Sequence, residues 1–417
     1  MILVMSPPRL ASAIFDGRMA SMIYLDHSAT TAVDPRVVAV MAPYWSELYG
    51  NPSSLYGLGR KAAAALEGAR SRVATLLNCQ PGEIVFTSGG TESDNLALRG
   101  VGMAQAARGR RHIVTTPIEH HAVLHTVTDL AERFEFDVTY LPVDRHGLVD
   151  PAAVAAFIRS DTALISVMAA NNEVGTVEPI AEIGAIARQH GIPFHTDAVQ
   201  GAGYLSLDVT SLNVDLLALS AHKFYGPKGV GLLYIRRGVK LAPIQTGGNQ
   251  ERGRRSGTEN VPYIVGMAHA LELAQGGLHS NVNRLFALRE RLASGLLAYI
   301  PDVELTGHPV QRLPGHLSLV IHGVEAEGIL IGLDLAGIAA SSGSACASGA
   351  PSASHVLKAM GFASEDAMGA LRLTLGRENT EADVEFVIEK LPEIVARVRA
   401  MSQKLEAGEV PRSQRGS

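Results

Sequence analysis

The stretch VDLLALSAHKFYGPKGVGLLYI, from Val214 to Ile235, decides the fold and directs attention to one lysine. A short apolar run ends at a polar cluster that contains Lys223, and Gly226 and Pro227 then bend the chain before a second apolar run. Short apolar runs bounded by turn residues predict buried strands. A lysine directly after a buried strand is partly removed from water, which lowers its pKa and makes its amine a usable nucleophile. The alternative is an ordinary surface lysine.

The composition limits the classes of protein. At 417 residues the chain exceeds the ~250 to 300 residues that one core serves, so we expect two domains or one large one. A net charge of -5 gives no general support for nucleic-acid binding, and no apolar run is long enough to cross a membrane, so we expect neither partner. Two cysteines make no disulfide scaffold, which favours a reducing compartment and a cytoplasmic location.

Short apolar runs alternate with helical patterns between about residues 60 and 275. This alternation predicts an α/β fold with a mainly parallel sheet. We expect helices to begin near Thr91, His120, Ile180 and Val261. The expected strands are 84–86, 113–115, 163–167, 193–196, 216–219 and 230–235.

The pattern changes after Gly276, which predicts a second, smaller α+β domain. A long helical stretch is followed by expected strands at 317–321 and 371–375, and a last helix has Thr380 as its expected N-cap and Pro392 as an expected kink. Its apolar face would carry Val384, Val387, Ile388, Leu391, Val395 and Val398. We expect a large domain at 38–277, a small domain formed by 22–37 and 278–403, an N-terminal extension at 1–21, and a flexible tail at 404–417.

Two further motifs give Lys223 a context. In FTSGGTESDNLALRG, residues 86–100, a glycine turn leads into a helix, and the backbone N–H groups of such a turn suit a phosphate, although a plain strand-to-helix turn would look the same. In FHTDAVQGAGY, residues 194–204, Asp197 closes a strand, where it could pair with a cationic ring nitrogen or simply cap the next helix. A phosphate turn, an acid and a Schiff-base lysine, in that order on one parallel sheet, are typical of a pyridoxal-phosphate site.

Motifs along the chain carry a family resemblance. They are YLDHSATT (24–31), GNPSS (50–54), TSGGTESDN (87–95), NNEVGT (171–176), HTDAVQ (195–200), SAHKFYGPKGVG (220–231), GGNQERGRRSGTEN (247–260), SSGSAC (341–346) and LRLTLGR (371–377). With these motifs, the chain resembles the cysteine desulfurases of the nitrogenase-maturation and iron-sulfur-assembly type, in the class V aminotransferase group, from about residue 22 to 400. The resemblance implies a fold-type-I pyridoxal-phosphate-dependent transferase with a seven-stranded sheet in the large domain, and a homodimer.

The resemblance also implies a role for individual residues. Lys223 would bind pyridoxal 5'-phosphate covalently, and Asp197 would keep the ring nitrogen protonated. His120 would stack on the ring and move a proton, while Gln200 and Asn172 would contact the phenolic oxygen. Gly90, Thr91, Ser220 and His222 would hold the phosphate, with Thr258 reaching in from the neighbouring subunit. Arg372 would bind the substrate carboxylate through its planar guanidinium, and Asn172 would also contact the substrate.

Cys346 distinguishes this chemistry from others of the same cofactor. Its surroundings, SSGSACASGAPSAS, have little apolar surface and predict a mobile loop from which a thiol could reach into a cleft; an inert buried cysteine is the alternative. The implied reaction takes sulfur from L-cysteine as a Cys346 persulfide, releases L-alanine, and passes the sulfur to an acceptor such as a cluster scaffold or a thiolation enzyme. Cys79, near the end of an amphipathic helix, is interpreted as structural.

Some alternatives stay open. A selenocysteine lyase or an aminotransferase would share the fold, and a non-catalytic assembly scaffold could keep it without the chemistry. Tyr56 stands where many relatives have histidine, and the loop after Cys346 lacks a Glu-Pro pair common in its branch, which leaves the acceptor open. His121 and His125 have the spacing of a metal pair, but without a third ligand we expect no metal site.

Overall fold

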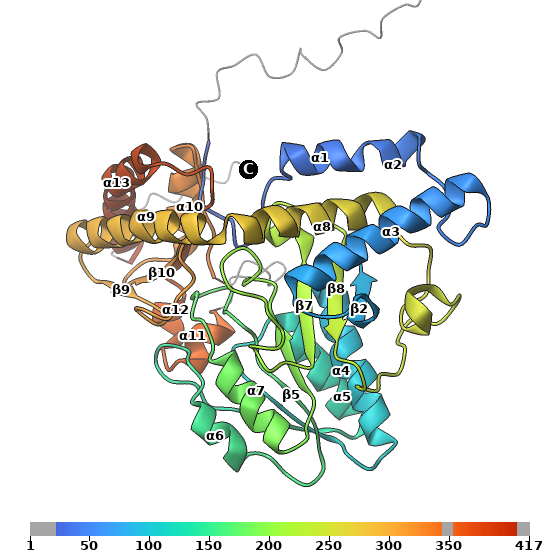
Figure 1. The fold of residues 1–417 in the computed structure, drawn as a ribbon. Helices are drawn as coiled ribbons and strands as arrows, with labels where there is room; N and C mark the ends of the chain where they lie inside the picture. Colours follow the sequence, from blue (N-terminus) through green and yellow to red (C-terminus); the bar gives the residue numbers. More distant parts are fainter. Residues whose placement is uncertain (1–21, 344–352, 407–417) are drawn as a thin grey trace, which may run out of the picture.

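The computed structural model describes residues 22–343 and 353–406, and a seven-stranded sheet organises it (Figure 1). The strand order is β2-β8-β7-β6-β5-β3-β4, with β8 antiparallel to both of its neighbours and every other pair parallel. The predicted α/β fold with a mainly parallel seven-stranded sheet is therefore confirmed. The strands are β2 (Ile84–Thr87), β3 (His112–Thr115), β4 (Asp137–Tyr140), β5 (Thr162–Ser166), β6 (Phe194–Asp197), β7 (Leu216–Ser220) and β8 (Gly231–Ile235).

Helices cover both faces of this sheet, and β7 shows how its residues divide. Leu217 and Leu219 belong to the core beneath α3 (Gly57–Leu76) and α8 (Val261–Gly276), while Leu216 and Ala218 belong to the core beneath α4 (Gly90–Ala106) and α5 (His121–Phe134). Because successive residues of a strand point to opposite faces, a strand covered on both sides must be apolar throughout. Edge strand β4, which is partly exposed, lacks such a run, and no strand is predicted there from the sequence.

A second, smaller sheet has the antiparallel order β12-β10-β9. It is formed by β9 (Val303–Leu305), β10 (His316–Ile321) and β12 (Ala370–Thr374). Its core is separate from those of the large sheet and includes residues of α9 (Leu278–Tyr299), α10 (Ala326–Leu335) and α13 (Glu381–Glu406). Short strand β1 (Ile23–Tyr24) pairs with β11 (Ile338–Ala339), so the start of the described chain joins this smaller region.

The final helix begins as its sequence predicts. The backbone N–H of Thr380 donates to the Asp383 carboxylate at 2.9 Å, and the backbone N–H of Asp383 donates to the Thr380 hydroxyl at 3.3 Å. These reciprocal bonds form a capping box. The helix runs uninterrupted through Pro392.

Several shorter elements complete the described chain, and none of its helices is long and apolar enough to cross a membrane. They are α1 (Pro35–Met41), α2 (Pro43–Ser46), α6 (Pro151–Ala156), α7 (Ile180–Gln189), α11 (His355–Ala359), α12 (Ser364–Ala367), and the 3-10 turns η1 (Pro81–Glu83), η2 (Ala221–Lys223) and η3 (Gln250–Gly253).

Candidate active site

Lys223 lies in turn η2, directly after β7 at the C-terminal edge of the parallel strands. Its Nζ donates hydrogen bonds to the backbone oxygens of Ser28, at 2.6 Å, and Ala29, at 2.8 Å. These carbonyls come from the segment after β1, which packs against the turn from the other end of the sequence. The amine is therefore held at one point by the main chain.

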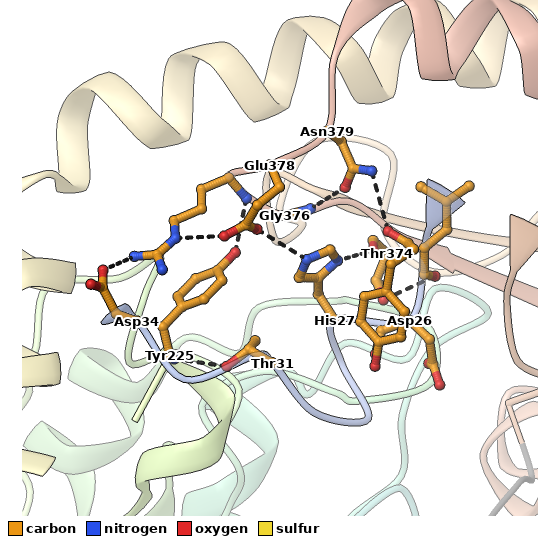
Figure 2. A network of polar contacts seen from close by, with 12 residues as sticks. Asp26, His27, Thr31, Asp34, Tyr225, Thr374, Gly376, Glu378 and Asn379 are labelled. Carbon is orange, nitrogen blue, oxygen red and sulfur yellow. Dashed lines mark hydrogen bonds and ion pairs between the residues drawn. The ribbon is translucent and has the colours of Figure 1, made fainter. Parts of the chain in front are cut away.

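The segment that receives Lys223 is fixed by a polar network that joins both sheets (Figure 2). The backbone N–H of Ser28 donates to the hydroxyl of Thr374, the last residue of β12, at 2.9 Å. On the other side, the Thr31 hydroxyl accepts from the backbone N–H of Tyr225 at 2.8 Å, and the Tyr225 hydroxyl accepts from the N–H of Arg377. The position of the lysine amine thus depends on contacts between elements more than a hundred residues apart.

Asp197 and Gln200 approach the same point from β6 and the turn after it. One Asp197 oxygen accepts from the backbone N–H of Val199 at 2.9 Å, so the carboxylate also stabilises its own turn. Burial raises the pKa of Asp197 to about 6, and the nearby positive charge of Lys223 opposes this rise. The Gln200 amide donates to the Ser28 carbonyl at 3.0 Å, the carbonyl that also receives Lys223.

His120 is the N-cap of α5, and its Nδ1 accepts from the backbone N–H of Ala122 at 3.0 Å. Burial first, and then the charge of Lys223, lower the pKa of His120 to about 4. The imidazole is therefore neutral near pH 7, and because Nδ1 is an acceptor, Nε2 carries the proton. The ring offers a donor at Nε2.

The glycine turn at the start of α4 packs closely against the strands. A Cβ on Gly90 would lie 2.8 Å from a Val199 methyl group, and a Cβ on Gly89 would lie 3.7 Å from the Ser220 hydroxyl. A side chain at position 90 would clash with Val199, so glycine is required for this close packing of the helix end. Thr91, in the first turn, is exposed, and His222 contacts the Thr30 hydroxyl through Nδ1 at 3.1 Å.

Arg372 enters the site from the middle of β12 in the smaller sheet. Its guanidinium donates to the backbone oxygen of Asn172 at 2.9 Å and to the Asp26 carboxylate at 2.8 Å. Its Nε is buried without a hydrogen-bond partner in the described part of the chain. Buried guanidinium donors of this kind suit a carboxylate ligand.

The described residues on either side of 344–352 are anchored beside Arg372 and Asn172. Ser341 and Arg372 exchange backbone hydrogen bonds, and the Ser354 hydroxyl donates to the carboxylate of Glu173 at 2.5 Å. Cys346 lies outside the described residues, and so does the loop around it that is predicted to be mobile. Ser341 and Ser354, which flank this segment in the sequence, both lie at this site.

The remaining predicted residues lie elsewhere. Thr258 is exposed on the loop between η3 and α8 and is not among the residues brought together above.

Burial raises the pKa of Cys79 to about 12, which fits a structural thiol. The His121 and His125 rings are 5.0 Å apart, and within 22–343 and 353–406 no group of three or more His, Cys, Asp or Glu residues could hold a metal.

Sequence reasoning missed the residues that act through backbone atoms or burial. Ser28 and Ala29 belong to the quoted motif YLDHSATT, but nothing in their side chains indicates that their carbonyls would receive Lys223. Asp94, in TESDN, and His195, in HTDAVQ, likewise received no role, and both are completely or almost completely buried beside Asp197. A polar residue inside or next to a catalytic motif is therefore a sequence signal for a buried residue that packs against the catalytic groups.

Comparisons with known proteins agree on one family. The aminotransferase class-V model matches residues 23–387. The chain is 52% identical over 380 residues to the cysteine desulfurase IscS of Methanosarcina thermophila, covering 91% of this chain and 93% of that one. It resembles a solved NifS-like protein with a TM-score of 0.84 at 40% identity, covering 90% of this chain and 100% of the other. It also resembles SspA in complex with cysteine, with a TM-score of 0.75 at 35% identity, covering 85% and 98%.

Proposed function

This chain belongs to the class-V aminotransferase family and is a cysteine desulfurase, and on that premise we propose that it uses pyridoxal 5'-phosphate to move sulfur from L-cysteine to Cys346. The observation that carries the proposal is the convergence of Lys223, Asp197 and His120 at one edge of the sheet, since the pKa values of Asp197 and His120 both respond to the lysine charge. The related SspA structure in complex with cysteine supports this substrate.

The residues present fit this cofactor. The N-cap of α4 is Gly89, which has no side chain to bond to the first N–H groups of the helix, so these groups can bind a phosphate, with Ser220, Thr91 and His222 nearby. Asp197 is a buried carboxylate suited to a protonated ring nitrogen, and Gln200 lies beside Lys223. When bound through Lys223, pyridoxal phosphate supplies an electron sink that weakens the bonds to the substrate Cα.

The chain's own residues have separate tasks in the reaction. Arg372 binds the cysteine carboxylate, displacing part of its present contact with Asp26. The Lys223 amine takes the Cα proton, and the Nε2–H of His120 donates a hydrogen bond at the reacting centre. The Cys346 thiolate forms the new S–S bond as the substrate C–S bond breaks, and the remaining carbon skeleton leaves as L-alanine. The persulfide then passes to an acceptor, either a cluster scaffold or a thiolation enzyme.

We also propose a homodimer with a shared site. Four large apolar side chains are exposed around α2 and the loop after it: Trp45, Tyr49, Leu55 and Tyr56. An exposed group of this kind is typical of a protein interface. In the dimer, exposed Thr258 would reach the phosphate of the neighbouring subunit, and the large domain would comprise 38–277 and the small domain 22–37 and 278–403.

The decisive experiment compares Lys223→Ala with Lys228→Ala. Lys228 is an exposed lysine in the same loop, so its removal controls for loss of positive charge. Lys223→Ala should abolish alanine and sulfide formation from L-cysteine and the borohydride-sensitive absorbance of the bound cofactor, while Lys228→Ala should retain both. Turnover retained in Lys223→Ala would overturn the proposal.

The role of Cys346 needs its own measurement, because it lies outside the described residues. After incubation with L-cysteine, mass spectrometry should find one added sulfur atom on Cys346 and none on Cys79. Cys346→Ser should lose the adduct and desulfuration. Adding each candidate acceptor protein should remove the sulfur from Cys346 only if that protein accepts it.

The two alternative activities need different substrates. L-selenocysteine would test the selenocysteine lyase alternative, and keto acids would test the aminotransferase alternative.

A further inference from the structure

Three carboxyl groups are buried together behind the site. Asp94 projects from α4, Glu119 precedes α5, and Asp197 ends β6; their side chains are 1%, 0% and 6% exposed. Each lies close enough to interact electrostatically with another: Asp197 raises the pKa of both Asp94 and Glu119. Three ionised carboxylates cannot share one buried space without a large electrostatic cost, so some of them must carry protons.

Asp94 faces His195 across a short gap. Oδ1 of Asp94 and Nε2 of His195 are 3.5 Å apart, and neither atom has a hydrogen-bond partner in the described part of the chain. The other ring nitrogen of His195 is 2.9 Å from the hydroxyl of Ser166. Two buried acceptors left facing each other would be unfavourable, whereas one hydrogen between them satisfies both.

The surroundings decide where that hydrogen resides. Burial lowers the pKa of His195 to about 3, and burial together with Asp197 and Glu119 raises the pKa of Asp94 well above its usual range. Both directions leave the imidazole neutral and the hydrogen on Asp94. Lys223, by contrast, acts on Asp197, whose carboxylate it helps to keep ionised.

Glu119 completes the charge balance. One of its oxygens accepts from the Thr116 hydroxyl and the Met168 N–H, both at 2.9 Å, while the other has no partner in the described part of the chain. Burial raises the pKa of Glu119 well above its usual range. Burial therefore favours the neutral forms of Asp94 and Glu119, whereas the charge of Lys223 favours the ionised form of Asp197.

We propose that Asp94 is a neutral positioning residue, which donates a hydrogen bond to His195 and, by carrying no charge itself, favours the ionised form of the nearby Asp197 carboxylate. The negative charge is then concentrated at the end of β6, where a cationic ring nitrogen can use it. The protonation state of Asp94 is a property of the chain without cofactor. Only its consequence for the ring nitrogen depends on the proposed function.

Infrared spectroscopy of the cofactor-free protein at neutral pH tests the protonation state directly. The wild type should show carbonyl bands of buried protonated carboxyl groups; Asp94→Asn should remove one of them and Glu119→Gln another, whereas Asp197→Asn should remove none. A spectrum of Asp94→Asn identical to the wild type would overturn the proposal, because Asp94 would then be ionised, for example as an ion pair with protonated His195. Circular dichroism verifies that each variant is folded.

The cofactor-loaded protein tests the consequence for Asp197. Asp94→Asn keeps a neutral donor facing His195. Its cofactor Kd should therefore stay within about twofold of the wild-type value, and the midpoint pH of the cofactor absorbance should stay within a few tenths of a pH unit. Asp94→Ala removes the donor and should shift that midpoint. Val101→Ala, a buried truncation on the same helix, should lower stability without a shift. An Asp94→Asn shift as large as that of Asp94→Ala would overturn the proposed role.

Discussion

The two sheets supply the site in different ways. The seven-stranded sheet delivers its residues at or soon after the ends of parallel strands: Asp197 ends β6, and Lys223 lies in the turn after β7. The three-stranded antiparallel sheet supplies Arg372 from the middle of β12, with its side chain reaching out to Asn172 and Asp26. The ends of parallel strands lie at one edge of the sheet, so each such residue lies in or beside the turn that follows its own strand. A residue from a strand centre depends instead on how two regions pack.

The environments differ as well. Asp197 is surrounded by buried groups, and desolvation is the largest influence on its pKa. Arg372 is equally buried but is held by a carboxylate and a carbonyl that a substrate could replace. We therefore expect changes in the large sheet to affect the chemical step and changes in the small sheet to affect substrate binding.

Asp197→Asn should have the largest effect. An amide cannot hold a proton on the ring nitrogen, so kcat should fall about a thousandfold while the KM for L-cysteine changes little. Steady-state kinetics on a variant with confirmed cofactor binding provides the measurement. A KM effect larger than the kcat effect would contradict this division between the sheets.

Arg372→Gln should raise the KM for L-cysteine about a hundredfold with a smaller change in kcat, because two charge-assisted hydrogen bonds to the carboxylate are lost. Arg372→Lys should recover only part of this, since an ammonium cannot make the planar paired contact. The amide of cysteine, which lacks the carboxylate, should bind both variants about as well as the wild type does. If kcat alone fell, Arg372 would belong with the chemical step.

Glu178 tests the junction between the two regions. Its neighbour Val177 donates a backbone hydrogen bond to Gln311, and burial raises the pKa of Glu178 from 4.5 to about 8. Because the folded-state pKa is raised, its protonated form stabilises the fold below the unfolded pKa, and that stability is lost as pH rises toward about 8. Glu178→Gln should remove this loss and gain on the order of 5 kcal/mol relative to the wild type across that interval. Denaturant unfolding at several pH values measures it; parallel curves would refute the assignment.

Tyr225→Phe should have the smallest effect. It keeps the ring, over which the Arg377 guanidinium lies at 3.8 Å, but removes the hydroxyl that accepts from the Arg377 N–H at 2.8 Å. The free energy of unfolding should fall by about 1 kcal/mol. Tyr299→Phe, at an exposed position outside the proposed dimer interface, is the control and should be neutral. A neutral Tyr225→Phe would mean that this bond does not stabilise the contact between the two regions.

The sequence predicted the large sheet well because its central strands are covered on both faces. Apolar runs marked β2, β3, β5, β6, β7 and β8, whereas the edge strands β4 and β9 have no such run. The family resemblance that the motifs indicated is confirmed by the match over residues 23–387. The individual roles of the site residues stay predictions.

By itself, the sequence determined which chemical groups follow which strands: a lysine after β7, an acid at the end of β6 and a glycine turn before α4. This information is local, because the turn that ends a strand lies beside it in the chain. Tertiary structure alone decided that the carbonyls of Ser28 and Ala29 receive Lys223, that Arg372 reaches Asn172, and that Asp94 faces His195. Those contacts join distant parts of the chain, and the burial that shifts the pKa values of Asp94 and His195 exists only once the chain is folded.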